Sequence, residues 1–200
     1  TVSGRAGVPL SDILARMQVA PKPVIAAING AAFAGGLGLV GASDIVVTVE
    51  DAAFSFSEVK IGVIPAVISV VCLPKLGTHH GMKLFLTGER FSGTQAVTMG
   101  LAHVAVPAAG LMAAVQHEIN AINAAGPLAL AECKKLVRRI PTLPRDEAFA
   151  EATTWSTRMF LSPEAAEGMA AFREKRKPEW AHPRSACGAP PQGGNAGGPA

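Results

Sequence analysis

Three glycines lie within four residues of one apolar run, the stretch "NGAAFAGGLGLVGASD" at residues 29–44. Gly35, Gly36 and Gly38 fall where this run is long enough to form a short helix. A helix N-terminus presents unpaired N–H groups and the positive end of the helix dipole, and glycine leaves both open to a ligand atom. The cluster therefore predicts a binding site for a negatively charged oxygen, either a phosphate or an oxyanion that develops during a reaction.

The same glycines have a simpler explanation, which is close packing of a helix against a neighbouring element. Their spacing matches neither the GxGxxG pattern of dinucleotide-binding folds nor the Gly-Lys-Ser/Thr ending of a phosphate-binding loop. On the glycines alone, the packing explanation is favoured over the binding site.

A second residue with chemical potential is Glu58, in "FSFSEVKIGVIP" at residues 54–65. It is the one carboxylate in this otherwise apolar or small-residue stretch, and it is predicted to lie at the end of a short strand. A carboxylate in an apolar pocket has a raised pKa and can carry a proton in both directions. The alternative is a solvated glutamate that pairs with nearby Lys60.

Two further groups of polar residues predict no site. His79 and His80 diverge on a helix and have no third metal ligand spaced with them, so we expect surface or capping histidines. A basic group at helical spacing contains no interleaved aromatic residues, and it predicts a solvated helix face rather than a nucleic-acid site. Its members are Lys134, Lys135, Arg138 and Arg139.

The composition narrows the class of protein. The 200 residues carry a net charge of only +3, which gives no argument for a nucleic-acid partner. The longest apolar run, residues 63–73, is too short to span a membrane. Three widely spaced cysteines form neither a metal pattern nor an even disulfide set, so a cytoplasmic location is expected. Cys72 and Cys133 lie in helical apolar patterns and are predicted to be small core residues.

The pattern of elements indicates an α/β fold. Strands are predicted within residues 21–30 and 44–58, and the glycine-rich helix at 35–42 lies between them, which makes a βαβ unit with a parallel or mixed sheet. A further strand is predicted at 101–107. The remaining chain is mainly helical, with an N-cap at Ser92 and a tail rich in Pro and Gly after residue 178. The predicted helices cover 66–77, 79–91, 92–100, 110–125, 127–140, 146–161 and 163–175.

Four blocks follow one another between about residues 20 and 178: "KPVIAAINGAAFAGGLGLVGASDIVV", "AAFSFSEVKIGVIPA", "LTGERFSGTQAVTMGLAHVAVP" and "EGMAAFREKRKPEW". In order and spacing they resemble the enoyl-CoA hydratase/isomerase (crotonase) superfamily. The resemblance implies a crotonase (ClpP-like) ββα spiral, an α/β fold with a helical C-terminal part. It divides the chain into the C-terminal part of the spiral core (1–107), a helical region (108–178) and a disordered tail (179–200).

The resemblance also assigns roles to residues. Members of this superfamily bind acyl-CoA and hold the thioester oxygen on backbone N–H groups, one of which matches Gly35. Glu58 matches a catalytic acid/base, Ala66 a water-anchoring N–H, and Gly36 and Lys175 substrate contacts. Coenzyme A would be part of the substrate, with no metal or other cofactor, no nucleic acid and no membrane. The expected assembly is a homotrimer or hexamer.

Two departures from the family pattern bear on the reaction. The position of a second hydratase glutamate is occupied by Gly38, and "PAVIS" replaces a glycine-rich segment after the Ile-Pro pair. Details of the motifs resemble the methylglutaconyl-CoA hydratases, which favours a hydratase acting on an enoyl-CoA thioester with a branched chain. A single glutamate also suits a Δ3,Δ2-enoyl-CoA isomerase, which remains the alternative.

A third departure lies at the start of the chain. Residues 1–20 contain no match to the family's N-terminal strands or to its first oxyanion donor, and they resemble the loop and helix that follow them. We therefore expect an N-terminally truncated chain. An inactive fragment or a crotonase-like scaffold is the second alternative to an active enzyme.

Overall fold

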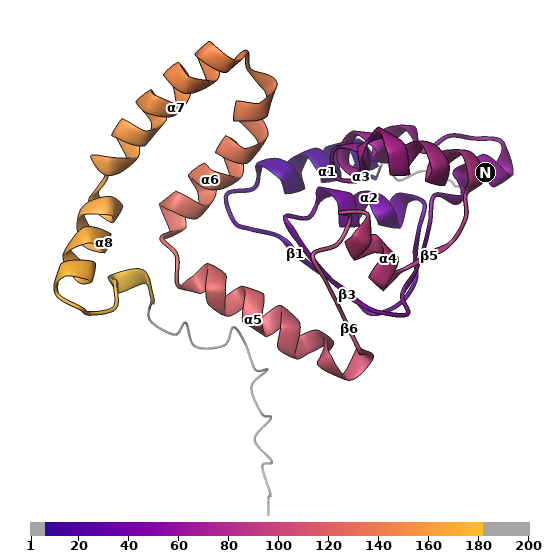
Figure 1. Ribbon diagram of the computed structural model, residues 1–200, viewed down its shortest axis with the longest axis horizontal. Coiled ribbons are helices and arrows are strands. Elements are labelled where there is room, and N and C mark those ends of the chain that lie inside the picture. Colours follow the sequence, from indigo (N-terminus) through magenta and orange to yellow (C-terminus); the bar gives the residue numbers. More distant parts are fainter. Residues whose placement is uncertain (1–6, 182–200) are drawn as a thin grey trace, which may run out of the picture.

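The computed structural model describes residues 7–181. In this part of the chain, one three-stranded sheet has the order β1-β3-β6 and is parallel throughout (Figure 1). Its strands are β1 (Ile25–Ile28), β3 (Ile45–Val49) and β6 (Val104–Val106). Helix α2 (Gly35–Ala42) connects β1 to β3, which confirms the predicted βαβ unit. β3 is the central strand, and Val46 and Val47 are completely buried.

A second sheet of three strands has the order β2-β4-β5. β2 runs parallel to β4, whereas β4 and β5 are antiparallel. The strands are β2 (Ala32–Phe33), β4 (Ala53–Ser55) and β5 (Phe91–Ser92). β4 is followed by the 3-10 helix η1 (Ser57–Ile61), so Glu58 lies on a helical turn and not at a strand end.

Three helices pack together beside the sheets: α1 (Leu10–Val19), α2 and α3 (Ala66–Thr87) (Figure 1). α3 covers both helices that the sequence predicts after Pro65, and its backbone leaves the helical conformation at Gly77, where φ is 65°. α3 ends at Gly88, whose φ is 55°. The largest completely buried side chains in the core include Phe54, Phe56, Leu37, Leu84 and Leu101.

The short helix α4 (Gly93–Thr98) follows the prediction closely. Gln95 N–H donates to Ser92 Oγ over 3.1 Å, and Ser92 N–H donates to Gln95 Oε1 over 2.8 Å. This reciprocal pair is a capping box, which satisfies two backbone donors at the helix start. The predicted N-cap at Ser92 is confirmed.

Helices make up the rest of the chain. α5 (Leu111–Asn123) packs on the first sheet, whereas α6 (Pro127–Arg139), α7 (Arg145–Phe160) and α8 (Pro163–Arg173) form an arm that extends away from the sheets (Figure 1). A disordered tail is predicted to begin at residue 179, but Glu179–Ala181 form a 3-10 helix. Trp180 ties this helix to the end of α5, since its Nε1 donates to Ala124 O over 3.3 Å. The remainder of that predicted tail, 182–200, lies outside the described residues. Within 7–181, no helix combines the length and apolar character needed to cross a bilayer.

Candidate active site

The N-terminus of α2 is open, as the oxyanion hypothesis requires. Gly35 is the first residue of the helix, so its N–H has no partner within the helix. A Cβ added to Gly35 would lie 3.4 Å from Leu10 Cδ2, and one added to Gly36 would lie no closer than 3.9 Å to Ala32 Cβ. Both positions therefore have space beside their backbone.

The glycines further along α2 are tightly packed. A Cβ on Gly38 would lie 2.6 Å from Ile68 Cγ2 and 3.2 Å from Leu14 Cδ1, and one on Gly41 would lie 2.7 Å from Cys72 Sγ. The packing explanation is therefore correct for this end of the cluster, whereas the first two glycines remain open. The structure also explains why position 38 holds no glutamate: Ile68 and Leu14 occupy the space that its side chain would need.

Ala34 connects the open helix start to the second sheet. It precedes α2 with φ 46° and ψ −122°, a conformation that residues with a Cβ rarely adopt. Its N–H donates to Ser55 O over 3.2 Å, at the end of β4. β2 and β4 are parallel and pair Phe33 with Ser55, so both chains leave the sheet at the same edge. The segments that carry Gly35 and Glu58 therefore begin side by side.

Glu58 lies on η1, three residues after β4 ends. Its Oε2 atom is buried and has no hydrogen-bond partner within residues 7–181. Lys60 is exposed, and the ion pairs described in this part of the chain do not include one with Glu58. Burying a carboxylate oxygen without a hydrogen-bond partner lowers the stability of the folded state. Its retention is consistent with a role in chemistry rather than with a solvated strand end.

Two other residues that the resemblance singles out are placed less favourably. Ala66 begins α3, and its N–H donates to Ile64 O over 2.8 Å, so a water bound there has to share this donor. Lys175 is exposed and follows α8, which stands away from the sheets (Figure 1). The structure thus brings the segments of Gly35 and Glu58 together, but it does not bring Lys175 to them. The roles of these residues stay predictions.

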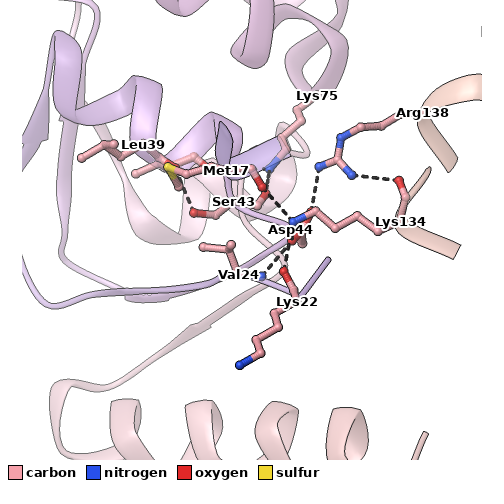
Figure 2. Close-up of polar contacts among 10 residues, drawn as sticks. Met17, Lys22, Val24, Leu39, Ser43, Asp44, Lys75, Lys134 and Arg138 are labelled. Carbon is pink, nitrogen blue, oxygen red and sulfur yellow. Dashed lines mark hydrogen bonds and ion pairs between the residues drawn. The ribbon is translucent and has the colours of Figure 1, made fainter. Parts of the chain in front are cut away.

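An ion cluster anchors the opposite end of α2 (Figure 2). Asp44 follows α2, and its carboxylate contacts Lys134 Nζ and Arg138 Nη2, each at 2.7 Å. Val24 N–H donates to the same carboxylate over 2.8 Å. Burial raises the pKa of Asp44, but the hydrogen bonds from Lys134 and Arg138 outweigh it and hold the pKa below its usual value.

This cluster corrects the prediction of a solvated basic face on α6 for Lys134 and, in part, for Arg138. Lys135 and Arg139 are exposed, as predicted. The side chain of Lys134 is only 6% exposed. Its ammonium also donates to Met17 O over 2.8 Å and to Lys22 O over 3.2 Å (Figure 2). The prediction failed for Lys134 because the partners of this residue lie far away in the sequence, and nothing in the local charge pattern indicates a partner carboxylate.

A second lysine holds the last turn of α2. Lys75 Nζ donates to Ser43 O over 2.7 Å and to Val40 O over 3.5 Å (Figure 2). Burial lowers the pKa of Lys75. A cation at the C-terminal carbonyls of a helix is favourable because it satisfies groups that have no partner within the helix. α2 is therefore fixed firmly at its C-terminus and left open at its N-terminus.

The two cysteines within the described residues differ. Cys72 is completely buried, as predicted, and burial raises its pKa to about 12. Cys133 is exposed, so its prediction as a core residue is wrong: α6 turns its neighbour Lys134 to the core instead. Cys133 lines a cavity of about 940 Å³ between α6 and the C-terminal end of α2, and Gly35 and Glu58 do not line this cavity.

Comparison with known proteins decides the family. The model of the enoyl-CoA hydratase/isomerase family matches residues 5–183. The chain belongs to this family. Curated relatives include the carnitinyl-CoA dehydratases of Proteus mirabilis and Salmonella typhi, which are 35% and 34% identical over 164 residues. Each match covers 80% of this chain and 63% of the relative, so the chain spans less than two thirds of their length.

Solved structures of enoyl-CoA hydratases share the fold. The enzyme from Shewanella pealeana superimposes with a TM-score of 0.81 at 35% identity, covering 86% of this chain and 64% of its own. The enzyme from Mycobacterium smegmatis gives a TM-score of 0.82 at 30% identity, covering 90% of this chain and 74% of its own. The predicted crotonase fold is confirmed.

Proposed function

We propose that this chain supplies the acid/base and one oxyanion donor for adding water across the C2=C3 bond of an enoyl-CoA thioester. The observation that carries the proposal is the buried Oε2 of Glu58, which has no hydrogen-bond partner among residues 7–181. It lies on a segment that leaves the sheet beside the open N-terminus of α2. A proton carrier beside an oxyanion donor is the pair that thioester enolate chemistry needs.

In the proposed reaction, the thioester oxygen lies against Gly35 N–H. The oxygen of water bonds to C3, and the electron pair of the double bond moves through C2 to the thioester oxygen. Gly35 N–H stabilises the resulting enolate, and loss of one such donor typically costs about 3–4 kcal/mol of transition-state stabilisation. Glu58 accepts the proton that water loses and delivers a proton to C2, which restores the thioester and the carboxylate.

The curated relatives support hydration chemistry, because a dehydratase catalyses the reverse of such an addition. The packing at Gly38 favours the alternative, a Δ3,Δ2-enoyl-CoA isomerase, because it leaves one carboxylate and a proton shuttle between C2 and C4 needs only one. Hydration of a branched enoyl-CoA remains the first proposal. Hydration adds water and isomerisation moves a proton, and neither involves a net oxidation or reduction. Coenzyme A therefore enters as part of the substrate, and neither reaction calls for a metal or redox cofactor.

The assembly and location follow as part of the same proposal. Phe160, Leu161 and Phe172 on the arm are 67%, 81% and 86% exposed, and such apolar side chains are expected to be covered by other copies in a homotrimer or hexamer. Cys72 and Cys133 are free thiols, which suits a reducing cytoplasm.

The test is an assay with two thioesters, on the 200-residue chain and on the longest reading frame that contains it. Loss of the conjugated-thioester absorbance of crotonyl-CoA indicates hydration, whereas a gain of this absorbance from a 3-enoyl-CoA indicates isomerisation. A protein that self-associates but neither binds nor converts either thioester supports the scaffold alternative.

Glu58→Gln tests the residue that carries the proposal. The amide keeps the shape of the side chain but cannot exchange a proton, so we expect kcat to fall by roughly 10²–10⁴-fold while acyl-CoA affinity stays nearly unchanged. Glu50→Gln, at an exposed turn, is the control and should keep the parent activity. Equal turnover in Glu58→Gln and the parent contradicts the assigned role.

A further inference from the structure

Ser55 ends strand β4 and bonds to two separate parts of the candidate site. Its carbonyl oxygen accepts the N–H of Ala34 over 3.2 Å. Its hydroxyl donates to Gly88 O over 2.9 Å, in a buried hydrogen bond. The side chain is enclosed, since Ser55 is only 3% exposed.

The first bond acts on the oxyanion donor. Ala34 has a φ of 46°, and a residue with a Cβ keeps such a conformation only where its surroundings impose it. Ser55 O is the hydrogen-bond acceptor of Ala34 N–H. The peptide that follows Ala34 carries the N–H of Gly35, so the direction of this donor depends on how Ala34 is held.

The second bond acts on the turn that carries Glu58. Gly88 packs closely against η1 and the residue before it: a Cβ added to Gly88 would lie 3.2 Å from both Phe56 O and Val59 Cγ1. These two residues flank the turn around Glu58. By holding Gly88 O, the hydroxyl of Ser55 keeps the end of α3 against this turn, and therefore limits how far Glu58 can move.

We propose that Ser55 is a positioning residue that sets the distance between the Gly35 N–H and the Glu58 carboxylate. The inference rests on the proposed function, since it assigns those two groups to one reaction. Alanine at position 55 keeps the backbone bond to Ala34 but leaves Gly88 O buried without its donor, which favours a shift of the turn. Misplacement of a reacting group by about 1 Å can lower a rate by roughly a hundredfold.

The test compares Ser55→Ala with a matched control, Ser43→Ala. Ser43 is 4% exposed, and its hydroxyl donates to Leu39 O over 2.9 Å at the far end of α2. Each variant loses one bond from a hydroxyl to a carbonyl, buried at Ser55 and part-buried at Ser43, so both should lower the melting temperature. We expect Ser55→Ala to lower kcat by roughly ten- to a hundredfold with KM within about twofold of the parent, and Ser43→Ala to change neither.

Amide hydrogen exchange supplies a second readout that needs no turnover. In Ser55→Ala, the amides of residues 57–62 are expected to exchange faster than in the parent, and those in Ser43→Ala are expected to match it. Equal kcat losses in the two variants, or unchanged exchange at 57–62 in Ser55→Ala, overturn the role of Ser55. If the parent converts neither crotonyl-CoA nor a 3-enoyl-CoA, the proposed function fails, and the exchange result still decides whether Ser55 holds the turn.

Discussion

A single methyl group at Gly38 is expected to destabilise the protein, whereas the same addition at Gly36 is expected to be neutral or stabilising. The new Cβ at position 38 would lie 2.6 Å from Ile68 Cγ2 and 3.2 Å from Leu14 Cδ1. Ile68 and Leu14 are 3% and 2% exposed, so neither can move into solvent. At Gly36 the nearest atom would be 3.9 Å away, which is an ordinary contact.

The expected magnitude follows from two opposing terms. Replacing glycine by alanine within a helix gains about 0.5–1 kcal/mol, and overpacking a core costs about 1–3 kcal/mol. Gly38→Ala should therefore lower the free energy of unfolding by up to about 2.5 kcal/mol, and Gly36→Ala should raise it by up to about 1 kcal/mol. For a chain of this size, the two variants should differ by about 2–12 °C in melting temperature.

The assay is urea unfolding and calorimetry of both variants and of Gly38→Ala combined with Ile68→Ala. Ile68→Ala alone should cost about 2–5 kcal/mol. The combined variant should lose about 1–3 kcal/mol less than the sum of the single losses, because the new methyl group enters the space that Ile68 leaves. Equal stability of Gly38→Ala and Gly36→Ala would refute the claim that packing excludes a side chain at position 38.

Two further predictions concern charged and titratable side chains. Lys134→Met should lower the free energy of unfolding, measured by urea titration, by about 3 kcal/mol. This is the lower end of the range for a broken buried ion pair, because Arg138 still contacts Asp44. Lys135→Met, on the exposed face, should change the same free energy by less than about 0.5 kcal/mol. Partial desolvation of the ring, followed by the nearby charge of Lys75, lowers the pKa of His103, whose Nδ1 accepts Val46 N–H. The contribution of this residue to stability should therefore be fully present above pH about 6.5 and fall as the pH drops below it. His103→Asn should flatten this dependence in melting curves between about pH 5 and 8, and an unchanged slope would contradict the assignment.

Local patterns were enough to predict most of the helices and the parallel βαβ unit. The helix at residues 127–140, for example, is observed as Pro127–Arg139, because its periodicity and flanking Gly126 are signals carried by neighbouring residues. β2 and β5 were missed because a two-residue strand has no detectable alternation. Yet β2 sets the edge at which the candidate site lies, so the element most important for the site carried the weakest signal.

The candidate site shows the same limit. The residue types at Gly35 and Glu58, with the family resemblance, predicted which groups could act. Sequence alone could not show that Gly38 is packed against Ile68, or that Ser55 reaches Gly88, because these contacts join segments 30 and 33 residues apart. Such pairings depend on the tertiary fold, and a single sequence gives no measure of them.

The bonds of Lys134 also bear on the order in which the core is completed during synthesis. Its ammonium reaches carbonyl oxygens 117 and 112 residues earlier in the chain. Closing such a long loop costs only about 1.5 kcal/mol more than closing the loop of 20 residues between β1 and β3. The long sequence separation therefore adds little to the free-energy cost of folding. Its larger consequence is the delay before Lys134 is synthesised.

A ribosome adds about 5–20 residues each second. Lys134, 90 residues after Asp44, is thus made about 5–18 s later than its partner carboxylate. During that interval the nascent sheet can already pair β1 with β3. Among residues 7–133, Val24 N–H is the one hydrogen-bond partner that the structure gives to the Asp44 carboxylate. Helix α6 is therefore made after these strands, and it brings the two cations, Lys134 and Arg138, that pair with Asp44.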